Sequence, residues 1–493
     1  MNIRPFAAVR AARIAPAKRL RSWIGAVASA LALVGTVLAP VAPAWAQDDG
    51  GDAPLSLIRD TEIEAILHED ADPVFIAAGL DPKVVQIHIV GDTDLNAFVA
   101  DGQNLFVNTG LIVRTKTPNE LIGVMAHETG HMAGGHLARS DQGNRQALAT
   151  FFITMGLAAL AAAARTPYAG EAAGALVYNA DYFATLTILT YTRTQEASAD
   201  QAAVTYLQKA HISAKGLVDF FDNFRYEEVF SGAKRYPFFQ SHPLTSDRIE
   251  ALRVRAAQQS YYDAVDSPEA LAKHAIMVAK LKAFTQPPQQ TLVDYPDSDT
   301  SFPARYARAI AYYRDLDTDR AVGLTDDLLK EQPDNPYLWE LKGQILFESG
   351  HAKEAEPAHR RSVELAPAAP LLRMNLGQTL LAENDKTKVD DAIAQIRRSL
   401  DAEPDNPYGW LLLSQAYDSK DQPGLARLCA AEEEFALGQA NEARIFAMRA
   451  RRNLPKNSPE WRRATDIVLV SKPSKDDLQA LAREGSVDPQ ERY

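Results

Sequence analysis

Residues 121–137 read LIGVMAHETGHMAGGHL and contain three histidines and one glutamate. An α-helix turns by about 100° per residue, so His127 and His131 would lie about 40° apart on one face and one turn apart along the axis. Two imidazoles in that arrangement can bind one metal ion, with Glu128 at their flank. His136 would lie about 180° from His127, so it cannot join the pair from the same helix.

The residues before this stretch predict the start of the helix. Thr117-Pro118-Asn119-Glu120 is a capping box with proline at the first helical position, and apolar residues follow at helical spacing. We expect a helix over 118–133 that ends at Gly134-Gly135. The histidine spacing also excludes the metzincin signature, whose third histidine would fall at Leu137.

A short sheet is expected ahead of this helix. Residues 84–90, VVQIHIV, are β-branched and short, as in a strand. In 96–110, NAFVADGQNLFVNTG, the pair Asp101-Gly102 separates two apolar-rich runs as a hairpin turn does. The motif helix should therefore follow a strand pair.

A second helix, predicted through TRTQEASADQAAVTYLQKA at 192–210, offers two acids to the histidines. Glu196 and Asp200 are four residues apart and so lie on one helical face. Glu196 can reach the metal while Asp200 orients a ligand histidine through its second ring nitrogen. The alternative is an exposed acidic face.

The bulk composition describes a multidomain globular protein. At 493 residues with 46% apolar content, the chain is long enough for two or three domains. The first 46 residues hold six basic residues and no acid, then an apolar run, then Ala44-x-Ala46 before Gln47. This pattern predicts a signal peptide cleaved after Ala46, with an uncut membrane anchor as the alternative.

The charge and the cysteine content exclude some partners and some stabilising bonds. Without its first 46 residues the chain has 46 basic residues against 64 acidic ones, a net charge of −18, which argues against a nucleic-acid partner. Cys429 is the only cysteine, so an internal disulfide is excluded. Residues 147–164 are alanine-rich and apolar, which favours a buried helix over a membrane-dipping segment.

The C-terminal part of the chain repeats. After a proline-rich polar stretch at 285–301, small residues recur at intervals of 34, 37 and 34 residues, and the first three are each followed by a proline twelve residues on. The alanines are Ala321, Ala355, Ala392 and Ala426, and the prolines are Pro333, Pro367 and Pro404. This resembles tetratricopeptide helix pairs and predicts an α-solenoid.

Taken together, the motifs resemble peptidase family M48, zinc endopeptidases of the gluzincin type. The resemblance rests on Asn96-Ala97-Phe98, the HETGH helix with His136 after it, the Glu196 and Asp200 pair, and His242-Pro243 with Arg248 downstream. The whole chain resembles an exported member of this family that carries repeats behind its peptidase domain.

This resemblance implies roles for individual residues. Glu196 would be the third zinc ligand after His127 and His131, Asp200 would orient a ligand, and His242 would lie by the metal as a reversible fourth ligand or a transition-state donor. Arg248 would enter the active site or else form a helix salt bridge. His136 matches a family position as a hydrogen-bonded structural residue and not as a ligand.

We therefore expect an α+β, mainly α protein: a gluzincin-type metallopeptidase domain with a small sheet, followed by a solenoid. The expected boundaries are a signal peptide at 1–46, the peptidase domain at 47–284, a linker at 285–301, the repeats at 302–470 and a polar tail at 471–493. One Zn²⁺ per chain would serve peptide hydrolysis, with Glu128 and His242 as catalytic residues.

The expected function is a periplasmic zinc endopeptidase that cleaves misfolded or stalled envelope proteins. Its repeats would recruit unfolded substrates or the outer-membrane β-barrel assembly machinery. One alternative is a chaperone or scaffold whose zinc site is closed. The other is an M48 peptidase anchored in the membrane through 147–164 or an uncut signal.

Overall fold

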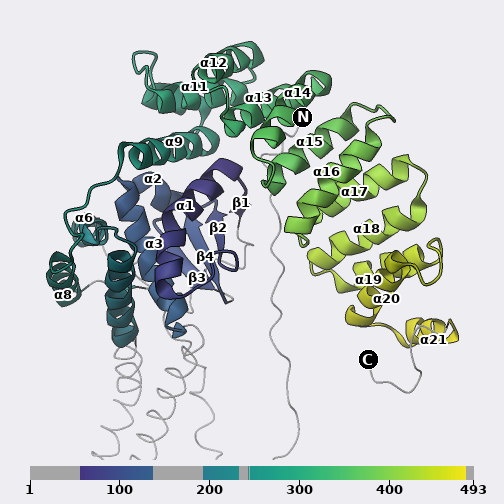
Figure 1. Cartoon of the computed structure of the whole chain (residues 1–493), viewed down its shortest axis with the longest axis horizontal. Helices are drawn as coiled ribbons and strands as arrows, with labels where there is room; N and C mark the ends of the chain where they lie inside the picture. Colours follow the sequence, from purple (N-terminus) through teal and green to yellow (C-terminus); the bar gives the residue numbers. More distant parts are fainter. Residues whose placement is uncertain (1–55, 101, 137–191, 232–241, 244, 485–493) are drawn as a thin grey trace, which may run out of the picture. The chain divides into compact units, whose positions relative to one another are not determined.

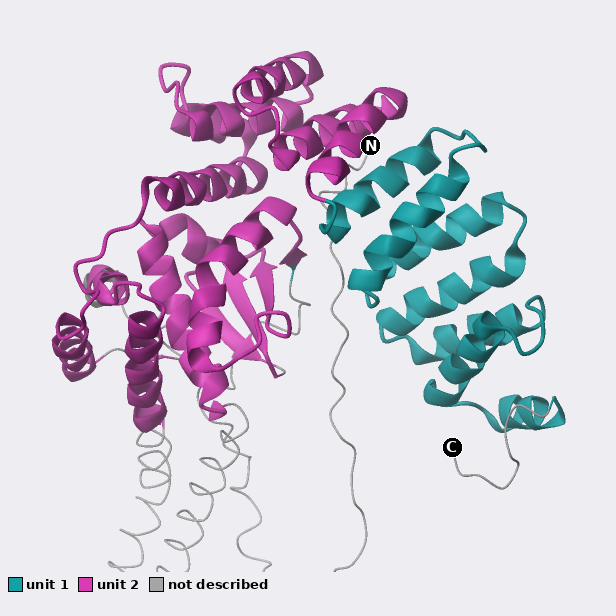
Figure 2. Cartoon of the chain, in the orientation of Figure 1, with its two compact units in different colours: residues 1–56, 367–493 teal, residues 57–366 magenta. Residues whose placement is uncertain are grey.

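The computed structural model describes residues 56–484 except 101, 137–191, 232–241 and 244 (Figure 1). The expected signal peptide and the apolar segment at 147–164 lie outside the described residues. Within the described part, no helix combines the length and apolar character needed to cross a membrane. The described residues divide into two compact units, residues 57–366 in one and Ser56 with residues 367–484 in the other (Figure 2).

A four-stranded sheet lies in the first unit, with strand order β1-β2-β4-β3. β2 (Gln86–Val90) and the hairpin of β3 (Ala97–Ala100) and β4 (Asn104–Asn108) confirm the predicted strands. β3 and β4 pair antiparallel, with Ala100 opposite Asn104, and Gly102 has a φ of 89°, as the tight turn requires. In the part of the chain that the structure describes, the strand order places β3 at an edge of the sheet.

Two features of the sheet were not predicted. The two-residue strand β1 (Leu57–Ile58) pairs antiparallel with β2, and β2 pairs parallel with β4. The parallel pairing joins strands that are separated in sequence by the hairpin partner β3. Sequence periodicity identifies a strand but does not identify its neighbour.

Helices pack against the sheet and enclose one core. Leu67 and Phe75 of α1, Leu105 of β4 and Val124 of α3 are fully buried in it. The helices of this part are α1 (Thr61–Ala78), α2 (Thr109–Arg114), α3 (Pro118–Ala133), a helical segment at 192–209, α6 (Lys215–Ser231), α8 (Ser246–Ala257) and α9 (Pro268–Thr285). We call the segment at 192–209 the Glu196 helix.

Helix pairs continue through the rest of the chain. In the first unit they are α11 (Phe302–Arg314), α12 (Thr318–Glu331), α13 (Pro336–Glu348) and α14 (Ala352–Leu365). In the second unit they are α15 (Pro370–Ala382), α16 (Val389–Ala402), α17 (Pro407–Ser419), α18 (Pro423–Ala436), α19 (Ala440–Arg451), α20 (Pro459–Val470) and α21 (Lys475–Arg483).

The repeat pattern has a physical basis in this arrangement. The periodic alanines lie in α12, α14, α16 and α18 and are buried. A Cβ at Gly343 would lie 2.2 Å from the ring of His359, and one at Gly377 would lie 2.5 Å from Ile396, so small residues stand where paired helices cross. Trp339 of α13 and Trp410 of α17, two repeats apart, each donate from the indole to a proline carbonyl.

The stretch 285–301 differs from an extended linker. It contains the short helix α10 (Pro288–Asp294), and Arg308 of α11 donates to the carbonyls of Tyr295, Pro296 and Asp299. Its prolines begin a helix here because proline suits the first helical position. The tail likewise holds α21, whose Leu481 is fully buried.

Candidate metal centre

The helix that carries the histidines forms where the sequence predicts it. α3 spans Pro118–Ala133, and Thr117 Oγ1 accepts a hydrogen bond from the backbone N–H of Glu120 at 3.2 Å. The second half of the capping box differs, because the Glu120 carboxylate accepts from the N–H of Lys116 at 2.7 Å and not from that of Thr117. Every residue from 118 to 131 except Asn119 is buried, so the motif is part of the core.

Glycines let the neighbouring helices approach α3 closely. A Cβ at Gly130 would lie 2.8 Å from the carbonyl oxygen of Ala199, in the Glu196 helix. A Cβ at Gly123 would lie 2.8 Å from Leu217 of α6. Gly130 stands between the two motif histidines in sequence, and Ala199 stands between Glu196 and Asp200. This close contact therefore sets the distance between the histidines and the acids.

Four buried side chains converge beside this contact. His127, His131, Glu196 and His242 each offer one ligand atom, and these atoms all lie within 4.8 Å of one another. His127 Nε2 lies 3.2 Å from His131 Nε2 and 3.4 Å from His242 Nδ1. Glu196 Oε1 lies 3.3 Å from His131 Nε2 and 3.0 Å from His242 Nδ1. The structure thus brings together two helices, α3 and the Glu196 helix, and the short segment at 242–243.

These separations fit a single zinc ion. Ligands about 2.0–2.1 Å from zinc in a tetrahedron stand about 3.3 Å from one another. Four of the six ligand–ligand distances are 3.0–3.4 Å and match the edges of such a tetrahedron, and all four ligand atoms lie within 4.8 Å of one another. Three nitrogens and one carboxylate oxygen are also a donor set that zinc prefers.

The local electrostatics favour a bound cation. Burial on its own would raise the pKa of Glu196, but contacts with His127, His131 and His242 hold that pKa far below its usual range. Burial would lower the pKa of His127, yet Asp200 and Glu196 outweigh it and raise this pKa to about 9. The field that holds a proton on His127 would equally attract a divalent cation.

Glu128 lies beside the cluster with its carboxylate buried. Both of its side-chain oxygens lack a hydrogen-bond partner among the described residues, and Oε1 lies 3.5 Å from His242 Nε2. Burial raises the pKa of Glu128 to about 7, although His127 and His131 oppose the shift. Burying a carboxylate without hydrogen-bond donors costs folding free energy. Such unpaired groups with shifted pKa values are typical of catalytic residues.

Asp200 and Arg248 support the cluster from behind. Asp200 Oδ1 lies 3.0 Å from His127 Nδ1, the ring nitrogen that faces away from the other ligands. Arg248 binds Asp200 through two nitrogens, at 2.5 and 2.9 Å, and lies 2.8 Å from Glu196 Oε2. It also donates to the carbonyl of Pro243 at 3.2 Å. Glu196 and Asp200 are therefore buried and do not form an exposed acidic face. Arg248 contacts both acids and, among the described residues, does not form a salt bridge within its own helix, α8.

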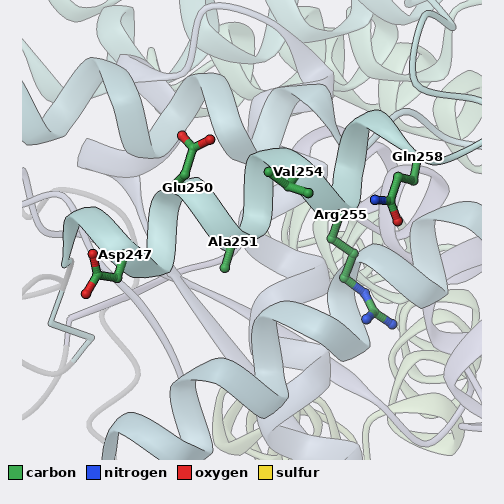
Figure 3. A pocket seen from close by; sticks show the side chains of 6 residues that line it. All are labelled: Asp247, Glu250, Ala251, Val254, Arg255 and Gln258. Atoms are coloured by element: carbon green, nitrogen blue, oxygen red, sulfur yellow. The ribbon is translucent and has the colours of Figure 1, made fainter.

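The family resemblance implied that His136 is a hydrogen-bonded structural residue, but its partner and the packing at Gly130 were not anticipated from the sequence. His136 is buried and lies against His131, with the two Nδ1 atoms 3.1 Å apart. The close packing of Gly130 against Ala199 was also missed, although glycine inside a helix is a signal for such contacts. A shallow hollow on the outer face of α8, lined by Asp247, Glu250, Ala251, Val254, Arg255 and Gln258, shares no residue with the cluster (Figure 3).

Comparison with known proteins agrees with this site. Residues 57–256 match the model of peptidase family M48. A Vibrio cholerae protein named "Putative beta-barrel assembly-enhancing protease" is 29% identical over 79% of this chain and 81% of its own length. The β-barrel assembly-enhancing protease of Escherichia coli is 26% identical over 72% of both chains, and that of Yersinia pestis is 26% identical over 67% of both.

The family match covers β1 to α8, the elements that carry every residue of the cluster. The similarity to the assembly-enhancing proteases extends past this part into the helical repeats, since it covers up to 79% of the chain. Residues 57–256 therefore form a peptidase domain of family M48, and the chain is a zinc metallopeptidase similar to β-barrel assembly-enhancing proteases over most of its length.

Proposed function

We propose that His127 Nε2, His131 Nε2 and Glu196 hold the catalytic zinc of an endopeptidase. The observation that carries the proposal is the convergence of four buried ligand atoms, with four of their six separations at 3.0–3.4 Å as in a zinc tetrahedron. His242 Nδ1 supplies the fourth corner. Asp200 Oδ1 lies 3.0 Å from His127 Nδ1, where its charge favours a proton on that nitrogen and so leaves Nε2 of the ring available to the metal.

A zinc ion held by His127, His131 and Glu196 would polarise the substrate carbonyl and lower the pKa of a water molecule toward neutrality. Glu128 accepts the proton of the attacking water on its carboxylate and passes it to the leaving amine. Its buried carboxylate, with a pKa raised to about 7, suits both steps because it can bind and release a proton near neutral pH. Arg248 fixes Asp200 and Glu196 at the same time.

His242 has two roles that fit its position. With Nδ1 3.0 Å from Glu196 Oε1 and 3.4 Å from His127 Nε2, it occupies the fourth ligand position. Turned away from that position, it could donate a hydrogen bond to the oxygen of the attacked carbonyl. The first role closes the site and the second assists the reaction, so one histidine would serve both a resting and a working enzyme.

The biological role follows from the relatives. Several are named β-barrel assembly-enhancing proteases, which supports a role for this chain in quality control of envelope proteins. We propose that it is exported to the periplasm by residues 1–46 and that its repeats recruit unfolded outer-membrane proteins or their assembly machinery. The proposed domains are a peptidase domain at 47–284 and repeats at 302–470.

Substrate would bind along the edge of the sheet. Among the described residues, β3 has no strand on its outer side, and an extended peptide could pair with it through main-chain hydrogen bonds. Such binding depends little on sequence, as cleavage of unfolded segments requires. Proline substitutions in β3 should abolish cleavage of unfolded substrates, and unchanged cleavage would exclude this mode.

The central test is Glu128→Gln. The variant should keep one zinc per chain by metal analysis and lose cleavage of an unfolded substrate such as casein. Glu120→Gln is a matched control, because Glu120 lies on the same helix but contacts Lys116 and Asn223 and not the cluster. Retained cleavage by Glu128→Gln would exclude the mechanism.

The closed position of His242 also favours the second candidate, a chaperone or scaffold whose zinc site is little used. Complementation of a deletion strain separates the two functions. Under this alternative, Glu128→Gln would restore envelope function as fully as the wild-type gene does.

A further inference from the structure

His131 has an unusual partner on its outer side. Its Nε2 faces His127 and Glu196, while its Nδ1 lies 3.1 Å from Nδ1 of His136. The two rings meet edge to face, with centroids 5.0 Å apart and an angle of 79° between their planes. His127 has a carboxylate, Asp200, in the corresponding place. His127 and His131, both on α3, therefore contact different kinds of group with their second ring nitrogen, a carboxylate and an imidazole.

The direction of the hydrogen bond can be assigned from the proposed function. An imidazole that offers the lone pair of Nε2 to a metal must carry its proton on Nδ1. His131 therefore donates from Nδ1–H, and His136 must accept at Nδ1 and carry its own proton on Nε2. A ligand histidine whose second nitrogen is engaged in this way has its ring orientation and tautomer fixed.

The local chain is built to return His136 to the end of α3. Gly134 ends the helix and Gly135 has a φ of 61°, a left-handed conformation that glycine adopts without strain. A Cβ at Gly134 would lie 2.6 Å from His136 Nε2, so the absence of a side chain there makes room for the ring. Gln195, next to Glu196, donates to the carbonyl of His136 at 3.4 Å.

We propose that His136 is a positioning residue for the zinc site. It accepts the hydrogen bond of His131 and holds that ring so that Nε2 points at the shared ion. This inference rests on the proposed function, since it takes His131 as a ligand. One ligand histidine, His131, would then be held by a neutral imidazole, while the other, His127, is held by the carboxylate of Asp200.

The test compares the zinc affinity of three variants with that of the wild type by competition with a chromophoric chelator. His136→Leu removes the acceptor and should weaken zinc binding by about 10–100-fold. His136→Asn can place its amide oxygen near the position of Nδ1, so it should stay within a few-fold of wild type. Gly134→Ala keeps a helical φ of −70° but displaces the ring, and it should weaken binding as His136→Leu does.

His68→Leu is the matched control. It removes another Nδ1 hydrogen bond, to Asp72 at 3.0 Å on α1, away from the cluster, and should leave zinc affinity unchanged. Thermal unfolding with excess chelator and with excess zinc gives a second readout. A positioning role lowers the zinc-dependent gain in Tm, whereas a purely structural role lowers Tm equally under both conditions.

The outcomes separate the two proposals. Wild-type affinity in both His136→Leu and Gly134→Ala, or equal weakening in His136→Asn and His136→Leu, would overturn the role of His136. If His136→Leu does not fold, Gly134→Ala and His136→Asn still decide. Glu196→Gln should lose zinc in every case, and if it binds zinc as tightly as wild type, the proposed ligand set itself fails.

Discussion

At the scale of single residues, the site depends on what lies behind each ligand. Asp200 is buried and bonded on one side to His127 and on the other to Arg248, so its charge serves two neighbours. Contacts with Arg248 and His127 hold the pKa of Asp200 below its usual value although burial would raise it. The carboxylate therefore stays ionised and orients His127 across the working pH range.

Asp200→Asn should consequently weaken zinc binding by about 10–100-fold, because the amide can present an N–H instead of an acceptor to His127. It also leaves Arg248 with only Glu196 as an anionic partner, which draws that ligand away from the metal. Chelator competition measures the loss. Asp219→Asn, on the α6 helix and outside the cluster, serves as a control, and equal affinity in both variants would contradict this role.

Much of the site could be predicted from the sequence at this scale. The spacing of His127 and His131 and of Glu196 and Asp200 fixes which side chains share a helical face, since helix geometry is regular. The contact between His136 and His131 could not be predicted. It depends on a glycine turn that reverses the chain after α3, and the φ of Gly135 is not encoded in periodicity.

At the scale of elements, the spacing between two helices decides whether the ligands meet. α3 and the Glu196 helix touch at Gly130 and Ala199, where an added Cβ would lie 2.8 Å from a backbone oxygen. A backbone atom cannot move aside as a flexible side chain can. Any side chain at Gly130 must therefore push the helices apart, and Glu196 with them.

Gly130→Ala tests this directly. Alanine favours a helix over glycine by about 1 kcal/mol, so on propensity alone the variant would be stabilised. We expect the opposite result, a loss of zinc affinity of at least tenfold by chelator competition and a lower Tm in the presence of zinc. The steric contact should exceed the gain in propensity.

Gly323→Ala is the matched control for that experiment. Gly323 lies inside α12 with nothing within 4 Å of an added Cβ, so the same exchange should raise stability slightly and leave zinc binding unchanged. If Gly130→Ala behaved like Gly323→Ala, the helix contact would not set the ligand distance.

The elements also show where sequence patterns succeed. α3 begins and ends as its cap and glycines predict, because those signals are local. The parallel pairing of β2 with β4 is a long-range contact, and the strand sequences alone do not specify it. The stretch expected as a linker at 285–301 includes the short helix α10, because Pro287 and Pro288 lie where they can begin a helix.

At the scale of the molecule, one helix belongs to two cores. Met277 and Leu281 of α9 are buried with the peptidase domain, while Ala279 and Ala283 are buried with α11 to α13. Composition placed a boundary just after α9, but packing joins the peptidase domain to the first repeats there. The second compact unit begins only at residue 367.

A buried charge network reinforces this junction. Lys280 of α9 lies 2.9 Å from the Asp60 carboxylate and 3.1 Å from Glu62 Oε2, and Tyr306 of α11 donates to the same oxygen at 2.8 Å. Lys280, Glu62 and Tyr306 are all less than 5% exposed. The nearby acids raise the pKa of Lys280 although burial alone would lower it, so the ammonium stays charged inside the junction.

Lys280→Met should therefore destabilise residues 57–366 strongly, since it leaves Asp60 and Glu62 without their cation. Removing one member of a buried ion pair costs about 3–5 kcal/mol, which corresponds to a fall in Tm on the order of 10 °C. Scanning calorimetry should show this fall in the transition of the first unit and none in that of residues 367–493. Lys330→Met removes a solvent-exposed pair with Asp327 and should leave both transitions unchanged.

Lys280→Met combined with Glu62→Leu should recover part of the loss, because the apolar pair no longer buries an unpaired charge beside Tyr306. A single variant as stable as wild type, or a double variant less stable than the single one, would show that the network does not hold the repeats to the peptidase domain.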